Sequence, residues 1–164
     1  MKNTSKDFTK KEETTRDFKP VFYITDDIDE CADAINKPHE DYPKRVPVTK
    51  ELIQKLVDLE VPNIDQTILW NIHSLLFREN PRRIRVGAFR MKNVTVAGEP
   101  TPDHTKIYDM MACILPVNKD SNLEEWYRSF QLIHPFEDGN GRVGGIVIAI
   151  LSFLKNKKYL TPEQ

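Results

Sequence analysis

Residues 142–158, RVGGIVIAILSFLKNKK, restrict the fold of this chain more than any other segment. Apolar side chains occupy almost every position, so a helix formed here has no polar face to turn toward water. A helix of that kind lies at the centre of a protein, with other elements packed around it. The segment therefore predicts a mainly α-helical protein built on a buried central helix.

The spacing of apolar residues elsewhere in the chain predicts the surrounding helices. Apolar residues recur at helical spacing in five further segments, which are 26–36, 50–60, 64–79, 103–115 and 122–133. Thr49 is the expected N-cap of the second of these, and the proline-punctuated stretch 37–47 is the expected linker before it. Segment 80–102 differs, because its alternating NVTV and its glycines predict a short β-hairpin or flap.

Length and charge restrict the class of protein. A chain of 164 residues is most simply one domain, which we place at 45–160, preceded by an N-terminal tail and short helix at 1–44. Residues 1–20 are charged and are expected to be poorly ordered. The formal net charge of −1 favours neither nucleic acid nor a membrane surface as partner. The first twenty residues contain no apolar run, so a cytoplasmic location is expected, with export by a specialised route as the alternative.

The stretch HPFEDGNGRVGG, residues 134–145, combines four glycines with a histidine, two acids and an arginine. Gly139, Gly141 and Gly144 match the dinucleotide-binding pattern G-x-G-x-x-G, but that pattern belongs between a strand and a helix, and the preceding segment here is helical. An ordinary tight turn explains the glycines alone. It does not explain the charged residues at four-residue intervals around them.

A phosphate site explains both features. Glycines at the start of a helix let backbone N–H groups approach an anion closely. Asp138 is a carboxylate of the kind that holds Mg²⁺ together with phosphate oxygens, and Arg142 can donate to a phosphate. Histidine is the side chain best suited to accept a proton near neutral pH, so His134 is a candidate base. Together these residues predict positioned phosphoryl chemistry.

The same residues carry a family resemblance. HPFEDGNGR resembles the signature of the Fic family, H-x-F-x-(D/E)-G-N-G-R-x-x-R, at all seven defined positions through Arg142. GAFR at 87–90 and the flap NVTVAG follow the order of a Fic core, and the resemblance covers about 45–160. It implies a Fic-fold helical core with a short β-hairpin flap.

The resemblance also implies an activity, the transfer of AMP from ATP to a Ser, Thr or Tyr hydroxyl of a target protein. His134 would be the general base, Phe136 would anchor the loop, and Asp138 would hold Mg²⁺. The anion hole and the grip on the β-phosphate would come from Gly139, Asn140, Gly141 and Arg142. Val94 and Thr95 of the flap would pair with an extended segment of the target protein.

One position departs from the family pattern. Gly145 stands where the family has a second arginine that contacts the γ-phosphate and pairs with an inhibitory glutamate. The inhibitory pattern (S/T)-x-x-x-E-(G/N) does not occur in this sequence, which leaves a separate inhibitory or regulatory protein open. An arginine placed at 145 is expected to restore the γ-phosphate contact.

Gly145 leaves two other functions open. Doc-like relatives lack the second arginine and transfer a phosphate, although they replace the second glycine of the loop with lysine, whereas Gly141 is present here. Other nucleotide or diphosphate donors also stay open. The second alternative is a Fic-fold binding or regulatory module without catalysis.

Overall fold

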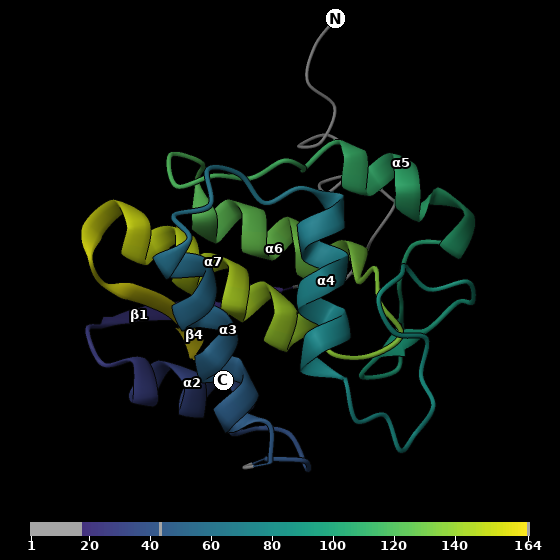
Figure 1. Ribbon diagram of the computed structural model, residues 1–164. Helices are drawn as coiled ribbons and strands as arrows, with labels where there is room; N and C mark the ends of the chain where they lie inside the picture. Colours follow the sequence, from purple (N-terminus) through teal and green to yellow (C-terminus); the bar gives the residue numbers. More distant parts are fainter. Residues whose placement is uncertain (1–17, 43, 164) are drawn as a thin grey trace, which may run out of the picture.

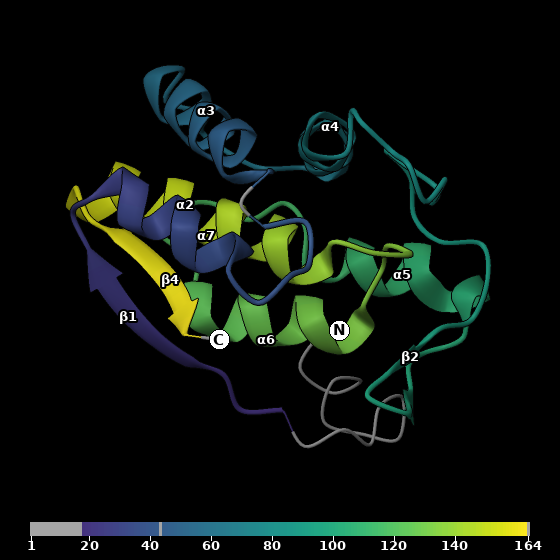
Figure 2. The ribbon, with the colours of Figure 1, turned by 90° about the horizontal axis from the view of Figure 1, so that it is seen from below.

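The computed structural model describes residues 18–42 and 44–163. Its centre is α7 (Asn140–Asn156), whose residues from Arg142 to Ser152 are all buried. Helices α3 (Val46–Asp58) and α4 (Gln66–Leu76) lie on one side of α7, and α6 (Leu123–Ile133) lies on the other (Figures 1 and 2). The predicted central helix and the mainly α-helical class are confirmed.

The smaller helices complete the layer around α7. Helix α2 (Ile28–Asn36) packs against α7 and α3, and its N-cap Asp27 accepts a hydrogen bond from the Asp29 N–H. The predicted segment 103–115 forms a 3₁₀ turn (His104–Lys106) followed by the short helix α5 (Ile107–Ala112). Asp65 caps α4 and Asn122 caps α6, each through a side-chain oxygen that accepts a backbone N–H.

The predicted start of α3 was wrong. The helix begins at Val46, with Pro47 in its first turn, so Thr49 lies inside the helix and is not its N-cap. Proline is tolerated there because the first backbone N–H groups of a helix have no intrahelical partner. The Thr49 hydroxyl donates to the Arg45 carbonyl and accepts from the Asn36 amide, which ties α3 to α2.

A second two-stranded sheet was not expected from the sequence. β1 (Val21–Thr25) pairs antiparallel with β4 (Tyr159–Glu163), with Tyr23 opposite Thr161. The two strands come from opposite ends of the described chain and lie beside α2 and α7 (Figure 2). Residues 1–17 of the expected tail at 1–20 lie outside the described residues. The Phe18 ring lies near the Tyr127 ring, with centroids 6.5 Å apart.

The predicted flap is present as a minimal hairpin. β2 (Thr95–Val96) pairs with β3 (Glu99–Pro100) across a turn in which Ala97 and Gly98 both have positive φ. That geometry is typical of the two-residue turns that join antiparallel strands. In the described part of the chain, no helix is long and apolar enough to cross a membrane.

Candidate functional site around the α6–α7 loop

His134 stands at the C-terminal end of α6 in a left-handed conformation. Its φ and ψ are 55° and 61°, and its N–H donates to the Phe130 carbonyl, which ends the helix. A residue other than glycine pays of order 1–2 kcal/mol for this conformation, so surrounding contacts must hold it. The backbone therefore turns sharply at the predicted general base.

Arg90 provides those contacts. Its side chain is 2% exposed, and its Nε donates to the His134 carbonyl at 2.6 Å, while Nη2 donates to the Ile133 carbonyl at 3.3 Å. The Arg90 backbone N–H also donates to the Pro135 carbonyl at 2.8 Å. One residue thus satisfies three consecutive carbonyls at the end of α6.

The same guanidinium also holds the flap. Arg90 Nη1 donates to the Lys92 carbonyl at 3.0 Å and Nη2 donates to the Pro102 carbonyl at 2.7 Å. These two carbonyls lie at the two ends of the segment that contains β2 and β3. Val94 and Thr95 are therefore tied to the backbone of His134 through a single buried side chain.

The loop between His134 and α7 is closed by Asn140. Its amide oxygen accepts the Phe136 N–H and its amide nitrogen donates to the Phe136 carbonyl, each at 2.9 Å. The Asn140 side chain is 2% exposed, and Phe136 is fully buried. Since both the oxygen and the nitrogen of the amide bond the loop itself, the side chain of Asn140 shapes the loop.

His73 of α4 packs against the loop. Its imidazole stacks on the Phe136 ring with centroids 4.1 Å apart, and Nε2 lies 3.0 Å from the Asp138 carbonyl. Nδ1 accepts the Gly87 N–H at 3.0 Å. This pair of contacts requires the tautomer with the proton on Nε2. Burial lowers the pKa of His73 to about 4, so the ring stays neutral at physiological pH.

Asp138 and Gly139 form the start of α7. The Asp138 Oδ1 accepts the Gly139 N–H at 2.7 Å, and Oδ2 lies 3.3 Å from the Arg82 guanidinium. The carboxylate is about one-third exposed. Gly139 has φ 83°, and a Cβ added to it would lie 2.3 Å from the Phe77 ring. Glycine is required here both by the conformation and by the close approach of Phe77.

The chemistry of Asp138 fits a magnesium ion. A single carboxylate that is about one-third exposed beside a helix start is suited to Mg²⁺, which usually takes one or two carboxylates and completes its shell with phosphate oxygens and water. Among the described residues, no group of three or more His, Cys, Asp or Glu side chains could hold a metal ion. Asp138 would be a protein ligand of the ion, with the phosphates supplying others.

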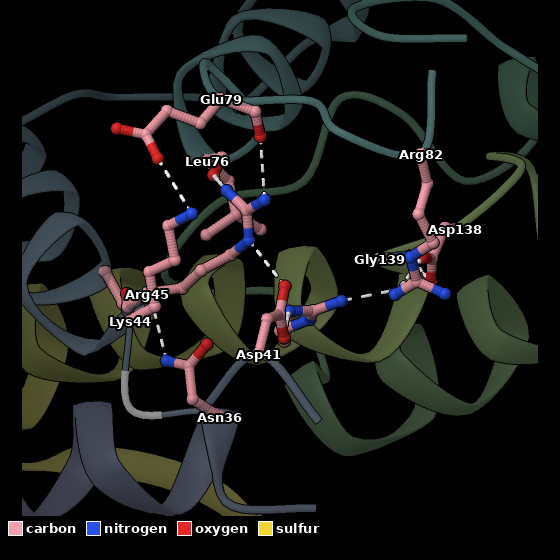
Figure 3. A network of polar contacts seen from close by, with 11 residues as sticks. Asn36, Asp41, Lys44, Arg45, Leu76, Glu79, Arg82, Asp138 and Gly139 are labelled. Carbon is pink, nitrogen blue, oxygen red and sulfur yellow. Dashed lines mark hydrogen bonds and ion pairs between the residues drawn. The ribbon is translucent and has the colours of Figure 1, made fainter. Parts of the chain in front are cut away.

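Arg142 lies in the first turn of α7 and is almost completely buried. Its Nη1 donates to the Asp41 Oδ1 at 2.6 Å, its Nη2 lies 3.9 Å from Asp138, and the guanidinium sits 5.0 Å from the centre of the Phe77 ring. Asp41 belongs to the segment between α2 and α3, which sequence analysis took for a plain linker. The predicted phosphate-binding arginine therefore has an acidic partner within the chain, Asp41, which Figure 3 labels.

A pocket of about 190 Å³ opens beside this cluster. Of the residues predicted for the site, Asp138 lines it. The other charged residues of its wall come from the α2–α3 linker, the start of α3 and the segment after α4; they are Glu40, Asp41, Lys44, Arg45 and Arg82. Phe77 and Ile84 form the apolar part of the wall. The pocket therefore combines an apolar wall with charged groups beside the start of α7.

Gly145 faces helix α2. A Cβ at this position would lie 3.1 Å from Ile35 Cγ1, and both residues are fully buried. The expectation that an arginine at 145 would restore a phosphate contact is therefore unsupported, because the side chain would meet α2 first. The close crossing of α2 and α7 explains why a residue without a side chain stands here.

These features describe a helical protein with a histidine-containing loop just before its central helix. The sequence matches the Fic/DOC family over residues 63–152, more than half of the 164 residues. The chain belongs to the Fic/DOC family. No curated protein sequence matches it.

Two solved structures are similar to this chain. A Fic family protein from Desulfovibrio desulfuricans G20 is 19% identical, with a TM-score of 0.54 over 77% of this chain and 43% of that one. A Fic domain-containing signaling protein from Bacteroides thetaiotaomicron VPI-5482 is 16% identical, with a TM-score of 0.49 over 68% of this chain and 48% of that one. The chain thus spans less than half the length of either protein, and the likeness concerns the fold.

Sequence reasoning missed four residues that shape the site: His73, Arg90, Asp41 and Arg45. Arg90 closes the GAFR segment, and a lone arginine after an apolar residue was the only local signal for it. His73 lies on the buried face of α4, but its two polar contacts lie 14 and 65 residues away. No periodicity predicts partners at such distances along the chain.

Proposed function

We propose that this protein transfers AMP from ATP to a hydroxyl side chain of a target protein. The observation that carries the proposal is the hydrogen-bonded unit formed by His134, the flap and the start of α7. Arg90 ties the first two together and Asn140 closes the loop to the third. A general base and an anion-binding helix terminus must be held in fixed relation for positioned transfer.

His134 takes the proton of the attacking hydroxyl in this reaction. The hydroxyl oxygen forms a bond to the α-phosphorus as the bond from that phosphorus to the bridging oxygen breaks, and pyrophosphate leaves with the bond electrons. The backbone N–H groups at the start of α7 and the Arg142 guanidinium stabilise the negative charge on the phosphates. When bound, Mg²⁺ neutralises phosphate charge beside Asp138.

The flap provides the site for the target protein. Among the described residues β2 and β3 pair only with each other, which leaves a strand edge for an extended segment of the partner. Thr95 is exposed and Val94 is half-buried, and the Val94 carbonyl accepts the Thr101 hydroxyl at 2.7 Å. Pairing at this edge would place a hydroxyl of the partner beside the flap, which Arg90 links to His134.

Transfer of labelled AMP tests this proposal. The full chain is incubated with α-labelled ATP, Mg²⁺ and cell lysate, and a labelled protein band is expected. The His134→Ala variant, with an unchanged melting temperature, should give none. Equal labelling by the variant contradicts the proposal. Parallel incubation with γ-labelled ATP separates phosphate transfer from AMP transfer.

The contact between Asp41 and Arg142 favours a second candidate, a binding or regulatory module without catalysis. A phosphate-binding arginine that is engaged by a carboxylate at 2.6 Å is less available to a nucleotide. Calorimetric titration with ATP and Mg²⁺ distinguishes the candidates. Binding accompanied by His134-dependent labelling supports the transferase, and the absence of both supports the module.

A further inference from the structure

Asp41 is clamped between two arginines that come from different helices. Its Oδ2 accepts from Arg45 Nε at 2.5 Å, and its Oδ1 accepts from Arg142 Nη1 at 2.6 Å. The two guanidiniums lie over the same Phe77 ring, 4.7 and 5.0 Å from its centre. Figure 3 shows Asp41 facing Arg45, whose guanidinium also points to the carbonyls of Leu76 and Glu79.

Arg45 is held in place independently of Asp41. Its Nη1 donates to the Leu76 carbonyl at 2.5 Å and its Nη2 donates to the Glu79 carbonyl at 2.7 Å, at and just beyond the C-terminal end of α4. The side chain is 7% exposed. Because α4 fixes the guanidinium, its Nε would keep its direction if Asp41 moved away.

Arg142 has unused hydrogen-bonding capacity. Its side chain is 1% exposed, and its Nε is buried without a hydrogen-bond partner among the described residues. A buried guanidinium N–H without an acceptor is unfavourable, so an additional acceptor at this point would be stabilising. A phosphate has more acceptor oxygens than a carboxylate and could satisfy Nε as well as Nη1.

Asp41 is accessible from the pocket. It lines the 190 Å³ pocket, its side chain is 19% exposed, and it lies on the segment between α2 and α3. Three acids and three bases line the pocket, so these residues balance in charge. Displacing Asp41 outward leaves the buried pair of arginines without their carboxylate and makes the pocket attractive to an anion.

We infer that Arg45 and Arg142 form a two-arginine subsite for a phosphate group, and that Asp41 fills this subsite when no donor is bound. The inference rests on the proposed function, which supplies a nucleotide polyphosphate as the ligand. Arg45 thereby provides a second guanidinium at the site, although position 145 has none. Asp41 acts as an internal competitor that the donor must displace.

Competition of this kind lowers the apparent affinity of the donor. The apparent dissociation constant is the intrinsic one divided by the fraction of molecules whose subsite is open. Removing the charge of Asp41 should therefore tighten binding, whereas removal of a binding residue would weaken it. The direction of the change distinguishes a competitor from a ligand-binding group.

Calorimetric titration of the full chain with inorganic pyrophosphate tests the inference. Asp41→Asn should bind pyrophosphate roughly tenfold more tightly than the wild type, or more. Asp120→Asn is the control, because it removes the same charge from an exposed acid that pairs with Lys155 and does not line this pocket. Its affinity should stay within about twofold of the wild type. Unchanged or weaker binding by Asp41→Asn overturns the inference, as does an equal gain in the control.

The contribution of Arg45 is tested in the Asp41→Asn background. Adding Arg45→Lys keeps the positive charge but removes the fixed Nε, and the gain in pyrophosphate affinity should be lost. Thermal melting of both variants verifies that α4 remains folded. A double variant that keeps the full gain shows that Arg45 takes no part, which also overturns the two-arginine subsite.

A measurement on the wild type covers the case in which Asp41→Asn does not fold. A crystal structure with pyrophosphate should place a phosphate oxygen within hydrogen-bonding distance of Arg45 Nε and Arg142 Nη1, with Asp41 moved away. Pyrophosphate bound elsewhere, or no pyrophosphate bound at all, contradicts the inference. AMP labelling that depends on His134 decides the proposed function separately, so either can fail alone.

Discussion

Arg90 Nε donates a hydrogen bond of 2.6 Å to the carbonyl of His134, a residue 44 positions further along the chain. The geometry of the predicted general base thus depends on a side chain that does not take part in the chemistry. Because the same guanidinium holds Lys92 and Pro102, the base and the target-binding flap share one support.

Replacing Arg90 by lysine should therefore damage both stability and transfer. A lysine keeps the charge but cannot serve four carbonyls with a planar fork, so buried acceptors lose their donors. We expect a loss of about 2–4 kcal/mol in the free energy of unfolding, measured by urea denaturation. Arg85→Lys is the control, because Arg85 Nε donates to the Phe89 carbonyl alone, and it should cost under about 1 kcal/mol. Similar losses in the two variants would contradict the shared-support role.

Replacing His73 by phenylalanine should loosen the loop while keeping the ring stack. The substitution leaves the Gly87 N–H and the Asp138 carbonyl without their partner, although the contact with Phe136 can remain. We expect a cost of about 2–4 kcal/mol, with faster amide hydrogen exchange at Gly87. Unchanged exchange at Gly87 would show that the His73 contact does not hold this segment.

The pH dependence of stability should report the Asp41 cluster. Burial would raise the pKa of Asp41, but hydrogen bonds from Arg142 and Arg45 outweigh it and lower the pKa to about 2. The folded protein therefore binds a proton at lower pH than the unfolded chain. This stabilisation is complete above about pH 4 and is lost as the pH falls toward 2, an effect of about 2 kcal/mol.

Asp41→Asn should remove that part of the acid sensitivity. Denaturation of the wild type and the variant is compared between pH 5 and 2, where the difference in unfolding free energy should shrink as the pH falls. Asp103, whose pKa is also lowered to about 2 by hydrogen bonds from Thr105 and Asn93, is present in both proteins and cancels. A constant difference across this range would show that Asp41 is not charge-paired in solution.

Two glycines of the loop should respond very differently to alanine. A Cβ at Gly139 would lie 2.3 Å from Phe77, and its φ of 83° disfavours any side chain, so Gly139→Ala should destabilise the protein by more than about 2 kcal/mol. At Gly141 the nearest neighbour is the Tyr127 hydroxyl at 4.0 Å, so Gly141→Ala should be neutral or stabilising by up to about 1 kcal/mol. Thermal melting compares them, and equal effects would contradict the packing of Phe77.

Local pattern was sufficient for most of the helices. The apolar run at 142–158 predicted the central helix because no other arrangement buries so continuous a surface. Turn residues around Gly98 predicted the flap, and the nine residues from His134 to Arg142 predicted where the candidate site lies. Each of these signals operates over one or two helical turns, which is the range that periodicity and capping describe.

The tertiary structure decided what those residues face. No local sequence signal predicts that Val21 pairs with Glu163 or that Asp41 bonds a side chain 101 positions away. The same is true of the close approach of Ile35 to Gly145. These contacts arise because packing around α7 brings distant segments within a few ångströms, where a buried charge must find a partner and a close helix crossing leaves no room for a side chain. The sequence determined which groups could bind a phosphate, and the packing decided that one of them is already engaged.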